Sequence, residues 1–224
     1  MENGYLDTQF DAGFRDLRWL PWVGSEYRTS AQRTIVLGES IYDYSKGVAA
    51  KRAQIEARSS LRERQLVHGI HETCVSKYLR NFAKAFYLKH GVNKAEREAL
   101  WRQMVYHNLV LRMMKSAKHR PGKRDYLEGW QTFLSLARQL EARRCVVYGL
   151  DPLKLAALKE ALTLDAGVTV VERKRLSEIG RSRPLRIVLD LGGRPLDMLF
   201  IRHPSAYFSW DEWGVVLRQF LGVQ

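Results

Sequence analysis

The sequence PLRIVLDLGGRPLDMLFIRH, residues 184–203, holds two apolar runs separated by Gly192 and Gly193. Paired glycines favour a tight turn, because glycine adopts positive φ without a steric penalty. We therefore predict a strand on each side of this turn, the second of which ends at His203. Apolar side chains dominate both runs, for example Ile187 to Leu189 in the first and Met198 to Ile201 in the second, as expected of strands that lie in a buried sheet.

Three further strands are predicted upstream, at residues 33–38, 144–149 and 167–172, and each is flanked by a glycine. Helices are predicted to begin near Asn93, Asp125, Asp151 and Asp211. Asn93 with Glu96 resembles a capping box, and the apolar positions of its helix continue to Leu109. Pro152 follows Asp151 at the first helical position, where its missing N–H costs nothing.

Strands separated by helices favour parallel pairing, with helices on both faces of the sheet. The fold class predicted is α/β, with a single domain over residues 1–224. We expect a three-layer α/β/α sandwich around a central, mainly parallel, four-stranded sheet. A long helical segment rich in Lys and Arg, at about 46–100, is expected as a basic insert in this domain.

The charge of the chain points to an anionic partner. Its 224 residues include 37 Lys and Arg against 24 Asp and Glu, a formal net charge of +13. A field of this sign attracts polyanions, of which nucleic acid is the commonest. No apolar stretch approaches the ~20 residues of a membrane span. The acidic first residues lack the apolar core of a secretory signal, so we expect a cytoplasmic protein.

The two cysteines, Cys74 and Cys145, are far apart in the sequence. Because structural zinc and iron–sulfur sites normally take four ligands, no metal site is expected. There is also no G-x-S-x-G nucleophile elbow and no carboxylate cluster suited to two metals. The sequence therefore disfavours both a hydrolase with a nucleophile elbow and a two-metal nuclease.

Two strand ends carry unusual chemistry. In VLGESIYDY, residues 36–44, Gly38 lets the chain turn sharply and delivers the side chains that follow it. In HPSAYF, residues 203–208, Pro204 fixes φ and removes a backbone donor, so His203 and Ser205 are held at set angles to the strand. Ligands of α/β sheets bind beyond the carboxyl ends of strands, which is where both segments fall.

The order of these motifs resembles the uracil-DNA glycosylase superfamily. The segment LRWLPWVGSEY, residues 17–27, is similar to the lead-in of bacterial members, and WRQMVYHNLV, residues 101–110, to their aromatic-rich helix ending in an asparagine. The resemblance covers roughly residues 19–213. It implies a uracil-DNA glycosylase-like fold and hydrolysis of the bond between a base and deoxyribose, after the nucleotide has been flipped out of the duplex.

The resemblance also implies roles for individual residues. Catalytic roles are expected of His203, as the donor to the departing base, and of Glu39, Ser40 and Asp43, as holders of the attacking water. Base-binding roles are expected of Gly38, Tyr42 and Asn108. DNA-binding roles are expected of Arg202, Ser205, Tyr207 and Phe208, with Tyr207 as the wedge that fills the vacated space. Ser40 stands where the best-known uracil-removing members carry an aspartate.

This departure leaves the substrate open. The predicted function is a monofunctional DNA glycosylase without metal or cofactor, acting as a monomer on DNA. Its base is uracil, or a modified pyrimidine such as a hypermodified cytosine of phage DNA, which would make it a defence rather than a repair enzyme. The alternative is a catalytically inactive protein that binds DNA or a lesion on the same scaffold.

Overall fold

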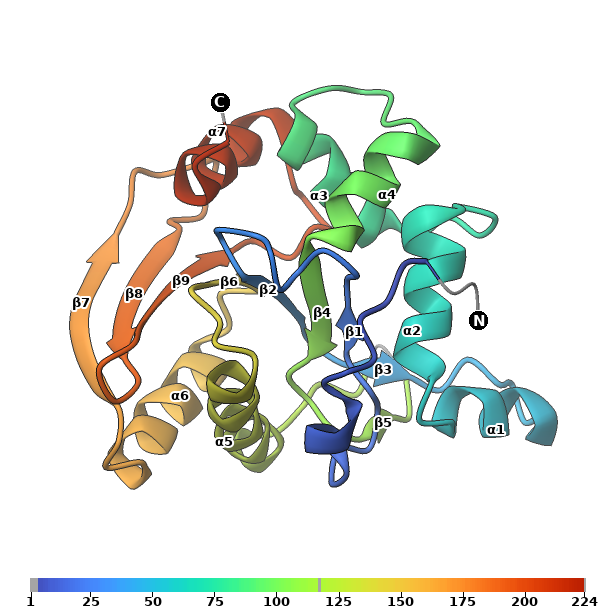
Figure 1. The fold of residues 1–224 in the computed structure, drawn as a ribbon, viewed down its shortest axis with the longest axis horizontal. Coiled ribbons are helices and arrows are strands. Elements are labelled where there is room, and N and C mark those ends of the chain that lie inside the picture. Colours follow the sequence, from blue (N-terminus) through green and yellow to red (C-terminus); the bar gives the residue numbers. More distant parts are fainter. Residues whose placement is uncertain (1–3, 117, 224) are drawn as a thin grey trace.

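The computed structural model describes residues 4–116 and 118–223. The strands are β1 Trp22–Val23, β2 Thr34–Gly38, β3 Ile41–Tyr42, β4 Met104–Asn108, β5 Met113–Met114, β6 Arg144–Tyr148, β7 Thr169–Arg175, β8 Leu185–Asp190 and β9 Pro195–Ile201. Seven of them form one sheet in the order β1-β4-β2-β6-β9-β8-β7, and β3 pairs with β5 separately (Figure 1). The sheet therefore has seven strands rather than the four predicted.

The middle of the sheet is parallel and its margins are antiparallel. β4, β2, β6 and β9 pair in parallel, whereas β1 at one margin and the β8 and β7 strands at the other run antiparallel to their neighbours. The predicted turn at Gly192 and Gly193 joins β8 to β9, and both glycines have positive φ. The carboxyl ends of the four parallel strands consequently meet at one edge.

The helix predicted to run from Asn93 to Leu109 is wrong in its second half. The capping box is present, because Asn93 Oδ1 accepts from Glu96 N–H at 3.0 Å, but helix α4 covers only Lys94–Arg102. The chain then continues as β4, in which all five residues are buried and pair with β2. A strand buried on both faces has no polar alternation, so its sequence resembles a continuing apolar helix.

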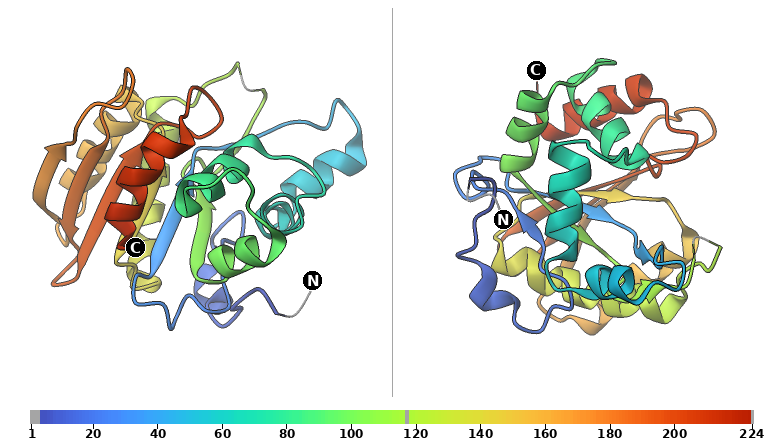
Figure 2. Two further views of the ribbon diagram at one scale, coloured as in Figure 1. Left: turned by 90° about the horizontal axis from the view of Figure 1, so that it is seen from above. Right: turned by 90° about the vertical axis from the view of Figure 1, so that its right-hand side faces the viewer.

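Helices cover both faces of the sheet, which gives three layers (Figures 1 and 2). Helices α5 Lys123–Gln139 and α6 Pro152–Leu164 pack on one face, and α2 Ser60–Arg64, α3 Lys77–Tyr87, α4 and α7 Trp210–Leu221 pack on the other. Alternate residues of β2 pack into cores on opposite faces of the sheet. Ile35 and Leu37 lie in the first core, on the side of α5 and α6, and Val36 lies in the second core, on the side of α2, α3, α4 and α7. This alternation follows from the two-residue period of a strand.

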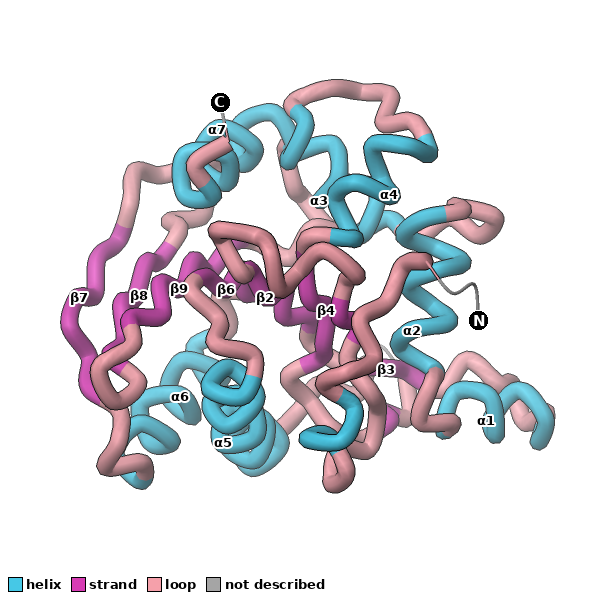
Figure 3. Tube along the Cα trace, in the orientation of Figure 1, coloured by secondary structure: helices cyan, strands magenta, loops and turns pink. Residues whose placement is uncertain are grey.

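The basic segment at about 46–100 supplies most of one helical layer. Its α1 Ala49–Glu56 has no buried residue and projects from the body, whereas α2, a π-helical turn at Gln65–Ile70, and α3 contribute to the second core (Figure 2). Figure 3 shows the loops that join these helices to one another and to the strands. None of the helices in the described ranges is long and apolar enough to span a bilayer.

The predicted helix starts are partly right. Asp151 caps α6 by accepting from Leu153 N–H at 2.8 Å, with Pro152 at the first position. Helix α5 begins earlier than predicted, because Gly122 is its N-cap and Asp125 accepts from Gly122 N–H at 2.8 Å from the third helical position. Ser209 precedes α7. These local signals predict where helices begin, but they do not predict the order of the strands in the sheet.

The connections create a crevice. The chain leaves β2 toward the face covered by α2–α4, and it leaves the adjacent β6 toward the face covered by α6. Where neighbouring parallel strands send their connections to opposite faces, a crevice opens beyond their carboxyl ends. The carboxyl ends of β2, β4, β6 and β9 surround it.

Candidate functional site

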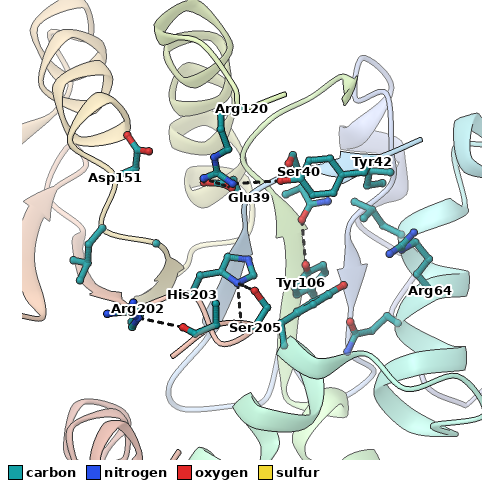
Figure 4. A pocket seen from close by; sticks show the side chains of 18 of the residues that line it. Glu39, Ser40, Tyr42, Arg64, Tyr106, Arg120, Asp151, Arg202, His203 and Ser205 are labelled. Carbon is teal, nitrogen blue, oxygen red and sulfur yellow. Dashed lines mark hydrogen bonds and ion pairs between the residues drawn. The ribbon is translucent and has the colours of Figure 1, made fainter. Parts of the chain in front are cut away.

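A cavity of about 610 Å³ lies at the carboxyl edge of the parallel strands (Figure 4). Four strand ends contribute Glu39, Asn108, Asp151 and His203 to its walls. The α2–α3 region closes it from the other side with Leu61, Arg64, Gln65 and Tyr78. Of the predicted site residues, the cavity brings together Glu39, Ser40, Tyr42, Asn108, Arg202, His203 and Ser205.

Glu39 is a buried carboxylate held by cations. Only 5% of the residue is exposed, and Arg120 Nη2 lies 2.7 Å from its Oε2. Lys154 Nζ lies 3.2 Å from its Oε1, to which the Tyr126 hydroxyl also donates at 3.1 Å. Burial acts to raise the pKa of Glu39, but the charges of Lys154 and Arg120 overcome it and hold that pKa below its ordinary value. Glu39 is therefore an anion at neutral pH.

Lys154 lies beneath the cavity floor. Its side chain is completely buried, donates to the Tyr148 carbonyl at 2.6 Å and lies over the ring of Tyr126. Burial lowers its pKa, an effect opposed by the Glu39 carboxylate. A buried charge persists only when it is paired and hydrogen-bonded, and Glu39 and the Tyr148 carbonyl meet both conditions. Lys154 thus fixes the orientation of Glu39 from below.

His203 is neutral, with one ring nitrogen facing the cavity. Burial lowers its pKa to about 4. Ser205 N–H donates to Nδ1 at 3.2 Å, which leaves the proton of the neutral ring on Nε2. The rings of Tyr148 and Tyr78 meet the imidazole edge-on, with centroids at 5.6 and 6.1 Å. Within the described residues Nε2 has no hydrogen-bond partner, so it is free to donate to a ligand.

Asn108 and Gly38 form one unit at the ends of two paired strands. Asn108 lines the cavity, and its Oδ1 accepts from the Tyr106 hydroxyl at 3.1 Å, which leaves the amide nitrogen to donate to a ligand. A Cβ at Gly38 would lie 2.3 Å from the Tyr106 hydroxyl and 2.4 Å from Asn108 Oδ1. Gly38 does not line the cavity itself. Its missing side chain is what lets this amide approach β2.

The β3 region supplies aromatic and hydroxyl groups. Tyr42 accepts from Arg120 Nη1 at 3.4 Å and meets Tyr44 edge-on. Ser40 lines the cavity, and its buried hydroxyl has no hydrogen-bond partner among the described residues. Asp43, by contrast, does not line the cavity: its Oδ1 accepts from Ser45 N–H at 2.9 Å in the following turn. The structure therefore separates Asp43 from the other predicted catalytic residues.

The loop after β9 forms the lip of the cavity. Arg202 donates to Ser182 Oγ at 2.9 Å and to the Ala206 carbonyl at 3.1 Å. Tyr207 is 87% exposed with a φ of 50°, and the guanidinium of Arg202 lies over its ring. Phe208 instead stacks on Trp213 of α7 with centroids at 5.7 Å. Tyr207 is thus available to a partner, whereas Phe208 packs against the protein.

Sequence reasoning missed the cations that surround Glu39. Arg120 comes from the loop before α5, and Lys154 from the first turn of α6. The nearest available signal was the position of Lys154, three residues after Asp151 at a strand end that faces the same crevice. In the described parts of the chain no three His, Cys, Asp or Glu side chains are grouped so that they could hold a metal ion.

No protein-family model matches this chain, and no curated protein matches it.

Proposed function

We propose that this protein is a DNA glycosylase that hydrolyses the N-glycosidic bond of a flipped-out pyrimidine and leaves an abasic site. The observation that carries the proposal is the meeting of Glu39 and His203, from opposite ends of the sequence, in one cavity. The net charge of +13 supports DNA as the partner. The parallel strands with a cavity at their carboxyl edge are compatible with a uracil-DNA glycosylase-like fold.

His203 is proposed to stabilise the departing base. When the bond between C1′ and the base nitrogen breaks, its electron pair leaves with the base. The Nε2–H of a neutral imidazole then donates to a base oxygen that gains negative charge. Such a preorganised donor in a dry site lowers the barrier because it does not have to reorient during the reaction. The edge-on tyrosine rings keep the imidazole in place.

Glu39 is proposed to orient the water that bonds to C1′. The proton that the water loses balances the charge of the departing base, either on the base or in solvent. The low pKa of Glu39 makes it a weak base, so its main contribution is to hold the water and to offset positive charge on the sugar. Ser40, with its unpartnered hydroxyl next in the chain, is the second candidate holder of that water.

The lip of the cavity is proposed to hold the DNA backbone. Flipping costs a few kcal/mol of lost stacking and pairing. Arg202 and Ser205 are suited to contact the flanking phosphates, and Tyr207 to enter the gap in the duplex as proteins with apolar wedges do. Asn108 offers its free amide to the edge of the base. The substrate proposed is uracil or a modified pyrimidine such as a hypermodified phage cytosine, processed in the cytoplasm by a monomer.

One observation favours the alternative of a protein that only binds DNA. Arg120 contacts both oxygens of Glu39, so in this conformation the carboxylate is occupied. For catalysis Arg120 has to release one of the two Glu39 oxygens, so that this oxygen can bind the water. The side chain of Arg120 is 54% exposed, so a DNA phosphate at the lip is able to draw it away.

The experiment is to incubate the protein with duplexes that contain uracil or modified cytosines, and then to cleave abasic sites with alkali. Strand breaks that depend on His203 support the glycosylase. Salt-sensitive binding without breaks from any base supports the binding protein. His203→Ala is informative only through product formation, because both readings expect it to bind DNA.

A further inference from the structure

The wall of the cavity formed by α2 and the π-helical turn contains polar groups that nothing in the protein satisfies. Gln65 lines the cavity and is only 1% exposed. Within the described residues neither its Oε1 nor its Nε2 has a hydrogen-bond partner. Leaving such groups unpaired costs more than their hydrogen bonds would contribute, so native proteins normally pair them.

The local backbone accommodates this amide. Gln65 begins the π-helical turn, and such turns occur often at functional sites. Gly69 makes room for the amide, because a Cβ there would lie 2.4 Å from Gln65 Nε2. The absence of a side chain at Gly69 is therefore what permits the amide to occupy this position.

The wall that contains Gln65 lies away from the proposed backbone-binding lip. Arg64, the neighbour of Gln65, is at the opposite side of the cavity from Arg202 (Figure 4). If the lip holds the phosphates, a group that reaches the Gln65 wall has to be attached to the base. The inference thus rests on the proposed function.

We infer that Gln65 forms a subsite for an uncharged, hydroxyl-bearing substituent on the flipped base. Its amide offers a donor and an acceptor side by side. An anionic substituent leaves the acceptor Oε1 unpaired, and a cationic one leaves the donor Nε2 unpaired. A hydroxyl pairs with either. A base without such a substituent leaves the subsite unsatisfied.

The test compares duplexes that carry cytosine, 5-methylcytosine, 5-hydroxymethylcytosine or glucosylated 5-hydroxymethylcytosine at one position. Both single-turnover excision and equilibrium binding are measured. The protein should prefer the hydroxylated bases to 5-methylcytosine by about tenfold or more, since each hydrogen bond that replaces an unpaired group contributes about that factor. Gln65→Met, which keeps the length but removes both polar atoms, should reduce this preference about tenfold. Gln131→Met, on the exposed side of α5, is the matched control and should keep it.

Two outcomes would overturn the subsite. One is the absence of any preference for hydroxylated bases in both excision and binding. The other is a Gln65→Met variant that keeps the preference and changes only the melting temperature, which would mean that a buried water satisfies the amide. If Gln65→Met does not fold, Gln65→Glu replaces it, because it keeps the shape of the side chain but exchanges the donor Nε2 for an acceptor, and the preference should fall in the same direction. A binding preference that Gln65→Met removes, without excision of any base, would uphold the subsite and refute the glycosylase.

Discussion

Two hollows of similar size lie at opposite edges of the same sheet. The one at the carboxyl edge measures about 610 Å³ and the one at the amino edge about 580 Å³. The amino-edge hollow is lined by more charge, namely Arg33, Arg138, Glu141, Arg143, Arg186, Arg194 and Asp197. On volume and charge alone the two are hard to rank as functional sites.

Burial separates them. At the amino edge the Arg186–Asp197 pair, at 2.8 Å, has side chains that are 37% and 23% exposed. At the carboxyl edge the side chains of Lys154 and Glu39 are 0% and 5% exposed. Exposed pairs contribute about 0–1 kcal/mol and keep their water, whereas buried charges have shifted pKa values and fixed positions. Burial of charge, more than its amount, therefore favours the carboxyl edge as the candidate functional site.

The largest effect is expected from His203→Ala. Loss of one preorganised donor to developing negative charge typically lowers a rate about 10²–10³-fold. Single-turnover excision, measured as alkali-labile strand breaks, should fall by that factor, while DNA affinity by fluorescence anisotropy stays within about twofold. A His203→Ala variant that excises at the rate of the unchanged protein would contradict the catalytic role proposed for His203 at the carboxyl edge.

Glu39→Gln should reduce both activity and stability. Loss of the carboxylate that holds the water lowers the rate by about 10²-fold or more. It also leaves the buried Lys154 without its counter-charge, which costs about 3–5 kcal/mol when a buried pair is broken. Urea unfolding and single-turnover excision measure the two effects.

Glu141→Gln, at the amino edge, is the matched control for Glu39→Gln. The Glu141 side chain is 57% exposed, so its loss should change the free energy of unfolding by less than about 0.5 kcal/mol. Equal destabilisation by the two changes would contradict the role given to burial.

The pH dependence of stability should also reflect burial. The pKa of His203 lies at about 4 in the folded protein against an ordinary 6.5. Between these values the unfolded chain binds a proton that the folded protein does not, so the free energy of unfolding falls as the pH drops from 6.5 toward 4. At about 1.4 kcal/mol per unit this amounts to about 3 kcal/mol.

His203→Asn should make that dependence shallower without removing it. Burial in β4 likewise lowers the pKa of His107 to about 4, so His107 retains its share of the dependence in the variant. Urea unfolding between pH 4.5 and 7 measures both slopes. Identical slopes for the variant and the unchanged protein would show that His203 is solvated in solution.

The sequence predicted the elements of the fold better than their arrangement. A glycine or a proline lies at or just after the end of β2, β6 and β9, and Asp151 with Pro152 marks the start of α6. These local signals are enough to predict the three strands and the helix. β4 was missed because a strand covered on both faces has no alternation to set it apart from the end of α4. β1 has only two residues, which are too few to show the period of a strand. The antiparallel margins of the sheet depend on pairing between strands, which no local sequence signal predicts.

The site was predicted in the same uneven way. His203, Ser205 and Glu39 follow strand ends, and parallel pairing brings strand ends together. Arg120 was missed because it sits in a basic loop, where its neighbours are solvated cations. Lys154 was missed because a lysine in the first turn of a helix normally faces water. The Tyr148 carbonyl and the Glu39 carboxylate, which only the tertiary structure brings to Lys154, turn it inward.

Gly38→Ala should have a moderate effect. The added Cβ would clash with the Tyr106 hydroxyl and with Asn108 Oδ1, which are the ends of two buried side chains that would have to shift. Overpacking of this kind costs about 1–3 kcal/mol. We also expect about tenfold slower excision, because the Asn108 amide is displaced. Gly91→Ala, where an added Cβ meets no atom within 4 Å, is the control and should alter neither quantity by more than experimental error.

The smallest effects are expected when a single arginine at either edge is replaced. Comparing the two replacements tests whether DNA contacts one edge of the sheet or both. Each phosphate contact contributes about −0.9 to the slope of log K against log salt concentration. Arg202→Gln, at the lip of the carboxyl-edge cavity, should therefore make that slope shallower by about one unit and weaken binding equally for all sequences. Arg194→Gln, at the amino edge, removes the same charge and should leave the slope unchanged. Because the two variants carry the same net charge, a difference between them cannot come from the overall field of the protein. Equal changes in slope would mean that DNA reaches both edges, and that the amino-edge hollow is part of the binding surface after all.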